Sequence, residues 1–257
     1  MGKKMGNAPV VLVLAQVQFN PVLVLEKYIP TIQESFRKLG FPDFRKNPIQ
    51  TFNLNVGDSH VVPVTSSIQY LFSDFEKGHA FVLLENALSY CVTEYDVFEE
   101  FSSQLLNGLK IVENAVNGIH YIDRVGVRYV DVICPDDDLS LYLTPSVMGL
   151  VGRMDGELVH SFSETVVRRG GVKTVSRAVM HSGAIGMPPD LQPLPVEISH
   201  RFGSLKRLHA ILDCDGNIQT RVKCDPEKLK RDLFLIHNEI DRAFRLIVTQ
   251  HALDKWR

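Results

Sequence analysis

The sequence predicts an α+β fold made of two antiparallel-sheet lobes, each backed by long amphipathic helices. Strand-like apolar runs separated by short turns occur in both halves of the 257 residues. Each half also ends in the same order: a hairpin, an aspartate at a helix start, then a helix of about five turns. A diverged duplication would explain this repetition, and the alternative is that a hairpin followed by a helix is simply common.

An acidic segment separates the two predicted lobes. Pro135 followed by Asp136, Asp137 and Asp138 cannot continue a strand. We therefore expect an N-terminal lobe over residues 1–134, an acidic connector over 135–141, and a C-terminal lobe over 142–257 that ends in a long helix.

Charge is distributed unevenly between the halves. Residues 1–140 hold 11 basic and 17 acidic side chains, whereas residues 141–257 hold 17 basic and 13 acidic ones, although the whole chain has a formal charge of −2. The asymmetry indicates either a face for nucleic acid or an acidic partner on the second half, or attraction between two packed halves.

In the first half, a nearly continuous β-branched run predicts a buried strand over residues 10–19. Apolar spacings of three and four predict a helix over 25–39 that stops at Gly40. Four further strands are expected. They cover residues 49–56, 67–73, 80–84 and 88–93, with a tight turn at Glu85-Asn86 joining the last two.

Asp96, with Glu99 three residues later, has the spacing of a capping box and predicts the start of a helix that ends near Gly118. One long strand over residues 119–133 follows. Its alternation places Arg124 and Arg128 on one face, and Val125, Val127 and Tyr129 on the other. Two arginines on a mostly buried strand require carboxylate partners or a bound anion, so this strand is a candidate structural pair or binding surface.

In the second half, strands over residues 157–168 and 172–180 flank Arg169-Gly170-Gly171, a predicted hairpin turn. Residues 182–195 contain four prolines and predict an ordered loop or a mobile flap. Strands over 205–214 and 217–223 predict another hairpin that turns at Asp215-Gly216. Asp225 as N-cap and Pro226 at the first helical position predict a long C-terminal helix.

The sequence contains none of the motifs of the common phosphate-binding, dinucleotide-binding, metalloprotease or serine-hydrolase enzymes. The four cysteines have neither zinc-finger nor redox-motif spacing, and we expect reduced thiols. We therefore expect no metal and no cofactor, and we lean towards a protein that is not an enzyme.

Two groups of residues remain as binding candidates. Arg168, Arg169, Lys173 and Arg177 bracket a hairpin and could contact phosphates, or could form a charged edge that blocks strand pairing. His237 flanks the apolar stripe of the last helix, as a buried histidine bonded to a carbonyl or carboxylate, or as a polar group that reaches into a cleft.

No apolar run is long enough to span a bilayer, and the apolar residues near the start do not form a signal peptide. We expect a cytoplasmic protein with no membrane partner.

Short sequence marks throughout the chain resemble those of a sporadically distributed prokaryotic family of about this length that has no assigned function. The marks are Asn7-Ala8-Pro9, Leu39-Gly40-Phe41-Pro42, Arg124-Val-Gly-Val-Arg128-Tyr129-Val130, and His237-x-x-Ile240-x-x-x-Phe244 followed by Thr249 and Trp256. The resemblance implies a bacterial or archaeal cytoplasmic accessory protein, and its patchy occurrence suggests antiviral defence or toxin–antitoxin neighbourhoods. It supplies no catalytic residues. The polar residue that the family carries after the Arg-Tyr pair is Asp131 here.

The leading hypothesis is a non-enzymatic binding or protein-interaction module of a prokaryotic defence, stress or toxin–antitoxin-type system, with a protein partner more probable than nucleic acid. One alternative is a hydrolase or nuclease with carboxylate and histidine residues in a cleft between the lobes. Another is a nucleic-acid binder that uses the basic C-terminal half. The sequence leaves the oligomeric state open.

Overall fold

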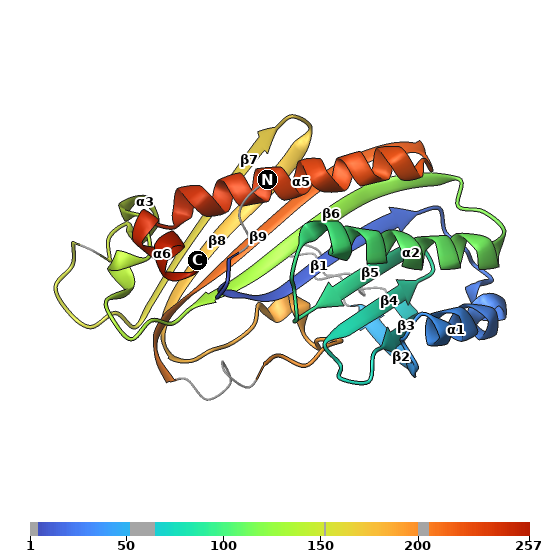
Figure 1. The fold of residues 1–257 in the computed structure, drawn as a ribbon, viewed down its shortest axis with the longest axis horizontal. Coiled ribbons are helices and arrows are strands. Elements are labelled where there is room, and N and C mark those ends of the chain that lie inside the picture. The colour runs from blue at the N-terminus through green and yellow to red at the C-terminus, as the bar shows by residue number, and fades with distance from the viewer. Residues whose placement is uncertain (1–4, 52–64, 152, 200–205) are drawn as a thin grey trace, which may run out of the picture.

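The strands form one nine-stranded antiparallel sheet (Figure 1). The computed structural model describes residues 5–51, 65–151, 153–199 and 206–257. Across the sheet the order is β2-β3-β4-β5-β1-β6-β9-β8-β7. The strand bounds are β1 Val10–Phe19, β2 Asp43–Thr51, β3 Thr65–Ser73, β4 His79–Leu84, β5 Ala87–Val92, β6 Tyr121–Ile133, β7 His160–Arg169, β8 Val172–Ala184 and β9 Lys206–Lys223.

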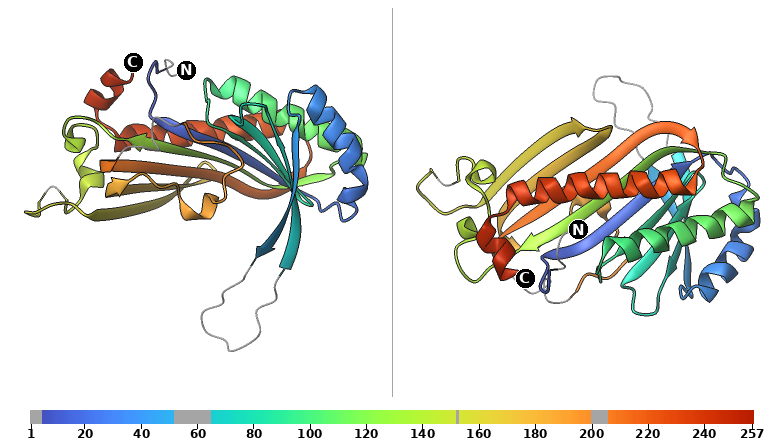
Figure 2. Two further views of the ribbon diagram at one scale, coloured as in Figure 1. Left: turned by 90° about the horizontal axis from the view of Figure 1, so that it is seen from below. Right: turned by 45° about the horizontal axis from the view of Figure 1, so that its top comes forward.

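Three long helices cover one face of this sheet (Figures 1 and 2). They are α1 Ile29–Lys38, α2 Phe98–Val116 and α5 Pro226–Ile247. Two short helices, α3 Pro145–Met148 and α6 Gln250–Lys255, and three single 3₁₀ turns, η1 Leu25–Tyr28, η2 Leu139–Leu141 and η3 Pro189–Leu191, complete the described structure. The α+β class is confirmed. No helix among the described residues is long and apolar enough to cross a membrane.

At the centre of the sheet β1 pairs with β6, and both strands belong to the lobe predicted over residues 1–134. The repeated order of elements divides the chain after α2 instead, into a first half with β1–β5 and α2 and a second half with β6–β9 and α5. In the first half β1 also pairs with β5, and in the second half β6 also pairs with β9. Each half therefore places its first strand beside its last strand, and a long helix follows that last strand. The halves share one sheet instead of forming separate ones, and common descent of the halves stays a prediction.

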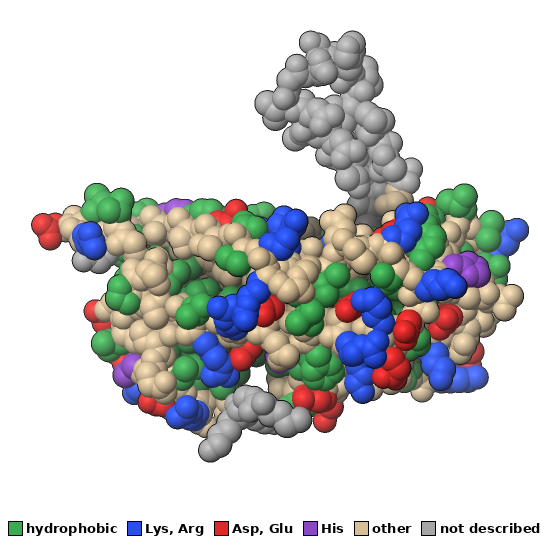
Figure 3. All heavy atoms as spheres, turned by 90° about the horizontal axis from the view of Figure 1, so that it is seen from above, with side chains coloured by type: hydrophobic (Ala, Val, Ile, Leu, Met, Phe, Trp, Pro, Cys, Tyr) green, Lys and Arg blue, Asp and Glu red, His purple; other side chains and the backbone are tan. Residues whose placement is uncertain are grey.

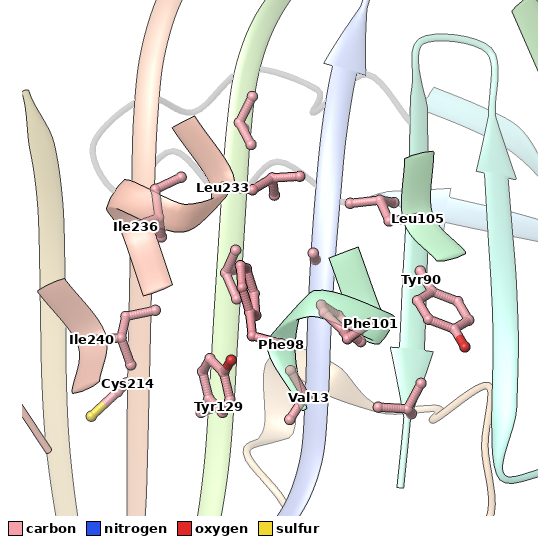
Figure 4. Close-up of a cluster of buried hydrophobic side chains, with 14 of the residues drawn as sticks. Val13, Tyr90, Phe98, Phe101, Leu105, Tyr129, Cys214, Leu233, Ile236 and Ile240 are labelled. Atoms are coloured by element: carbon pink, nitrogen blue, oxygen red, sulfur yellow. The ribbon is translucent and has the colours of Figure 1, made fainter. Parts of the chain in front are cut away.

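Apolar side chains bury both faces of the sheet. The larger cluster lies between the sheet and the helices, with Ile32 of α1, Leu105 of α2 and Ile236 of α5 all fully buried (Figure 4). The smaller cluster lies on the opposite face. There, apolar side chains from residues 185–198 pack against Val130 and Val132 of β6, so the proline-rich segment covers sheet surface.

The predicted hairpin at Asp215-Gly216 is wrong, because β9 runs unbroken through both residues. β9 pairs with β6 along one edge and with β8 along the other, and Gly216 lies opposite both Val127 and Thr174. Two complete ladders outweigh the local turn preference of the dipeptide. Gly216 is instead a point of close packing, since a Cβ there would lie 2.7 Å from Ile236 of α5.

The predicted capping box at Asp96 is also wrong. Helix α2 begins at Phe98, with Val97 as its N-cap and no side-chain hydrogen bond at that position. Asp96 therefore precedes the N-cap, and Glu99 is the second helical residue instead of the third, although the two are three positions apart.

Other local signals are confirmed. The Asp225 carboxylate accepts hydrogen bonds from the backbone N–H groups of Glu227, at 2.9 Å, and Lys228, at 3.2 Å, at the start of α5. β7 and β8 form the hairpin expected around Gly170-Gly171, and β4 and β5 the one expected around Glu85-Asn86. The strand expected over 49–56 ends at Thr51 within β2, and residues 52–56 lie outside the described residues.

Helix α2 approaches β4 closely at Gly108. A Cβ there would lie 2.3 Å from the ring of Phe81, which is fully buried. Gly108→Ala should therefore destabilise the protein by about 1–3 kcal/mol through overpacking. This is the reverse of the ordinary effect in a helix interior, where alanine is more favourable than glycine by about 1 kcal/mol. Urea unfolding checks this, with Asn107→Ala at the exposed neighbouring position as the control. A Gly108→Ala variant as stable as the control would contradict the close packing.

Candidate functional site

The alternation predicted along β6 sorts its polar side chains onto two faces. Val125, Val127 and Tyr129 belong to the core beneath the helices, as expected. Arg128 alternates with these residues and shares the parity of Val130 and Val132, which pack on the opposite face of the sheet. The two faces of the strand consequently present different chemistry.

Arg128 is the centre of a buried ion network. Its guanidinium donates to both carboxylate oxygens of Asp213, at 2.6 and 2.8 Å, and to Asp190 at 2.5 and 3.1 Å. Arg177 also donates to Asp213, at 3.1 Å, and to Glu164, at 2.7 Å. The pKa of Asp190 is lowered, primarily by its hydrogen bonds from Arg128. This network ties η3 to the sheet, and its donors are used within the protein.

Arg124 is not part of that network. Its Nη1 donates to Gln16 at 3.4 Å, and its guanidinium lies against Gly126, where a Cβ would be 3.0 Å away. The two arginines thus share a face of β6, as predicted. They have different hydrogen-bond partners, although the charges of both act on the carboxylate of Asp215.

The basic hairpin is partly neutralised. Arg169 pairs with Glu239 at 3.3 Å, and Arg177 belongs to the Arg128 network. Arg168 and Lys173 lie opposite each other near the hairpin end. On the face of the molecule seen in Figure 3, basic side chains are interspersed with acidic ones.

A pocket of about 540 Å³ opens on the helix side of the sheet. Its walls come from the N-terminal segment 5–10, from residues 95–99 at the start of α2, from residues 234–245 of α5, and from β6 and β9. Figure 4 shows Tyr129 of β6 and Cys214 of β9 on neighbouring strands beneath α5, with Phe98 of α2 close by. We call this cavity the α2–α5 pocket.

A hydrogen-bonded chain of rings lines the pocket. The Tyr129 hydroxyl lies 2.9 Å from Nδ1 of His237 and 3.2 Å from the Tyr95 hydroxyl. The His237 ring stacks on Phe98, with centroids 4.2 Å apart and planes 6° apart. The structure therefore brings together two residues that the sequence indicated separately, Tyr129 and His237, and puts His237 in a cavity wall.

Burial keeps this chain neutral. It lowers the pKa of His237, raises that of Tyr129 well above its ordinary value and raises that of Tyr95 to about 12. Burial also raises the pKa of the Cys214 thiol to about 12. At neutral pH these four groups offer hydrogen bonds but no charge.

Asp131 is the residue that sequence reasoning did not select. It lies two positions after Tyr129, faces the same pocket and is only 6% exposed. Among the described residues, none donates a hydrogen bond to its carboxyl group. Burial raises the pKa of Asp131 to about 7. A carboxyl on the inner face of a buried strand was a readable signal, because its position has the same parity as Val127 and Tyr129.

Charged residues at the pocket wall are mostly acidic. Glu99 and Asp241 line it together with Arg245, and the Arg245 Nε donates to Asp241 at 2.9 Å. Among the described residues, no group of three or more His, Cys, Asp or Glu side chains is arranged to hold a metal ion. The wall therefore combines aromatic surface with an unpaired buried acid.

Comparisons with protein-family models, with curated proteins and with solved structures found no match. The resemblance to a sporadic prokaryotic family consequently stays a prediction.

Arg128→Met should destabilise the fold by about 3–5 kcal/mol, because it leaves the buried Asp213 carboxylate with Arg177 alone. Arg221→Met is the matched control, since Arg221 forms an exposed pair with Asp123 and its loss should change the stability little. Chemical denaturation measures both. If both variants lost an equally small free energy of unfolding, the buried network would not stabilise the structure.

Asp131→Asn should stabilise the protein above neutral pH. With a pKa of about 7 in the folded state and about 4 in the unfolded chain, Asp131 binds its proton more tightly when folded. Stability therefore falls as pH rises through this window, by up to about 1.4 kcal/mol per unit. The variant should melt above the parent at pH 8, with a much smaller gap at pH 4.5.

Comparing the two proteins at each pH cancels the contribution of His237, which both retain. A gap that does not change with pH would mean that Asp131 titrates in the folded protein as it does in water.

Proposed function

We propose that this protein is a non-enzymatic binding module that holds a small organic ligand in the α2–α5 pocket. The observation that carries the proposal is the buried carboxyl of Asp131, which faces a cavity of about 540 Å³ and pairs with none of the described residues. Small-molecule sites typically have volumes of about 300–1,000 Å³, mostly apolar walls and a few convergent polar groups. Native proteins rarely bury a polar group without a partner unless it has a role.

The state of the polar groups favours binding over nucleophilic catalysis. Tyr129 and Cys214 have raised pKa values, so neither is an activated nucleophile. His237 and Tyr129 are hydrogen-bonded to each other within a stacked aromatic wall. Such a wall orients a ligand by shape and by hydrogen bonds.

A hydrolase is the second candidate, and one observation favours it. An acid whose pKa is about 7 can exchange protons at neutral pH, which suits general acid–base catalysis. His237 in the same pocket could accept or donate a second proton. The two candidates differ in whether the bound molecule leaves unchanged.

The wider role belongs to the same proposal and rests on the family resemblance. We place the module in a prokaryotic defence, stress or toxin–antitoxin-type system, where ligand binding would alter its contact with a protein partner. Nucleic-acid binding is disfavoured by the ion pairs that engage Arg169 and Arg177.

Ligand-observed NMR with a mixture of neutral and charged fragments tests the pocket. Fragments should give saturation-transfer signals with the parent protein, and these should be lost in Ala8→Phe, because Ala8 lines the cavity and a phenyl group would fill it. Ser103→Phe, on the exposed side of α2, is the matched control. Bound fragments should be recovered with unchanged mass.

Signals that survive Ala8→Phe would place the binding elsewhere and contradict the proposal. Recovery of hydrolysed fragments, at a rate that depends on Asp131, would favour the hydrolase instead.

A further inference from the structure

The α2–α5 pocket has a surplus of negative charge. Among the described residues that line it, four are acidic and one, Arg245, is a lysine or arginine; Arg245 pairs with Asp241 at 2.9 Å. The acidic residues are Asp96, Glu99, Asp131 and Asp241. An anionic ligand would meet like charge from two sides of this cavity.

Asp131 meets no counter-charge among the residues that the structure describes. Among the described residues, no lysine, arginine or histidine forms an ion pair with it, although its side chain is more than nine-tenths buried. The ionisable groups that line the same cavity come from every element packed against β6. They are Tyr95 and Asp96 before α2, Glu99 of α2, Cys214 of β9, Tyr129 of β6 itself, and His237, Asp241 and Arg245 of α5.

We propose that the ligand of this pocket is an organic cation, an ammonium group on a compact apolar or aromatic skeleton, whose charge pairs with Asp131. This inference rests on the proposed function and names its ligand class.

An ammonium group is complementary both to the carboxylate of Asp131 and to the aromatic rings of the pocket. It supplies the hydrogen-bond donors and the positive charge that a buried carboxylate requires, which no described residue provides. The faces of aromatic rings attract cations, and rings from three elements line the cavity. These rings are Tyr95, Phe98, Tyr129, Phe234 and Phe244.

Binding of a cation should depend on pH in a defined direction. Burial raises the pKa of Asp131 to about 7, so below that pH the ammonium group must displace a proton. Affinity for an amine should therefore rise about tenfold from pH 6 to pH 8. His237 adds little to this change, because burial lowers its pKa and it is already neutral.

The test uses nine compounds in matched sets. Each of three skeletons, 2-phenylethyl, cyclohexylmethyl and hexyl, carries an amine, a hydroxyl or a carboxylate, and calorimetry at pH 8 measures affinity. On any skeleton that binds, the amine should bind at least about tenfold more tightly than the alcohol, and the carboxylate should not bind.

Two variants locate the charge that is recognised. Asp131→Asn should abolish the preference for the amine and its pH dependence, and it should fold, because it removes an unpaired buried charge. Asp123→Asn is the matched control, since that carboxylate pairs with Arg221 outside the pocket wall, and it should change amine affinity by less than about threefold.

The outcomes separate this inference from the proposed function. Alcohols that bind as tightly as amines, or an amine preference that survives Asp131→Asn, would overturn the cation assignment and leave the pocket as a ligand site. Fragments that bind while none of the amines does would overturn it too. Failure of all nine compounds, together with fragment signals insensitive to Ala8→Phe, would remove the proposed function as well.

Discussion

The central strand β6 is the constraint on which the rest of the molecule depends. It pairs with β1 on one side and β9 on the other, and core side chains cover both of its faces. With both edges paired, the strand cannot slip by one residue without turning every side chain to the wrong face. The network at Arg128 and the pocket groups Tyr129 and Asp131 are therefore fixed relative to one another by a single piece of backbone.

The two faces of β6 treat their polar groups differently. On one face Arg128, Asp213 and Asp190 satisfy one another across strands and a covering segment. On the helix face Tyr129 finds His237 and Tyr95, yet Asp131 is left without a donor among the described residues. The fold satisfies the buried Arg128 guanidinium, whereas three residues later no described residue donates to the Asp131 carboxyl group. This contrast supports the proposal that Asp131 pairs with a bound ligand.

The sequence predicts this structure well where the signal is local or periodic. The Asp225 cap, the turn at Gly170-Gly171 and the facing of Arg128 and Tyr129 all depend on short-range rules. The hairpin predicted at Asp215-Gly216 is wrong because two neighbouring strands pair with β9 through these residues and keep it a continuous strand. No local sequence pattern records that pairing. The site divides in the same way. The parity of Asp131 was readable. Its position beside the start of α2 and beside His237 follows from packing between segments that are far apart in the sequence, separated by 34 positions for Tyr95 and Tyr129 and by 108 for Tyr129 and His237.

An open sheet has two ends, and its strand order makes these β2 and β7. An unpaired strand edge is a template for further strands, and hence for aggregation. β2 carries Pro48, which lacks a backbone N–H to offer, and the charged side chains of Asp43, Arg45 and Lys46. β7 is less guarded, because Phe162, Val166 and Val167 are each more than half exposed between its charged residues. Of the two edge strands in the described sheet, β7 is therefore the one that is more open to pairing with a strand of another molecule.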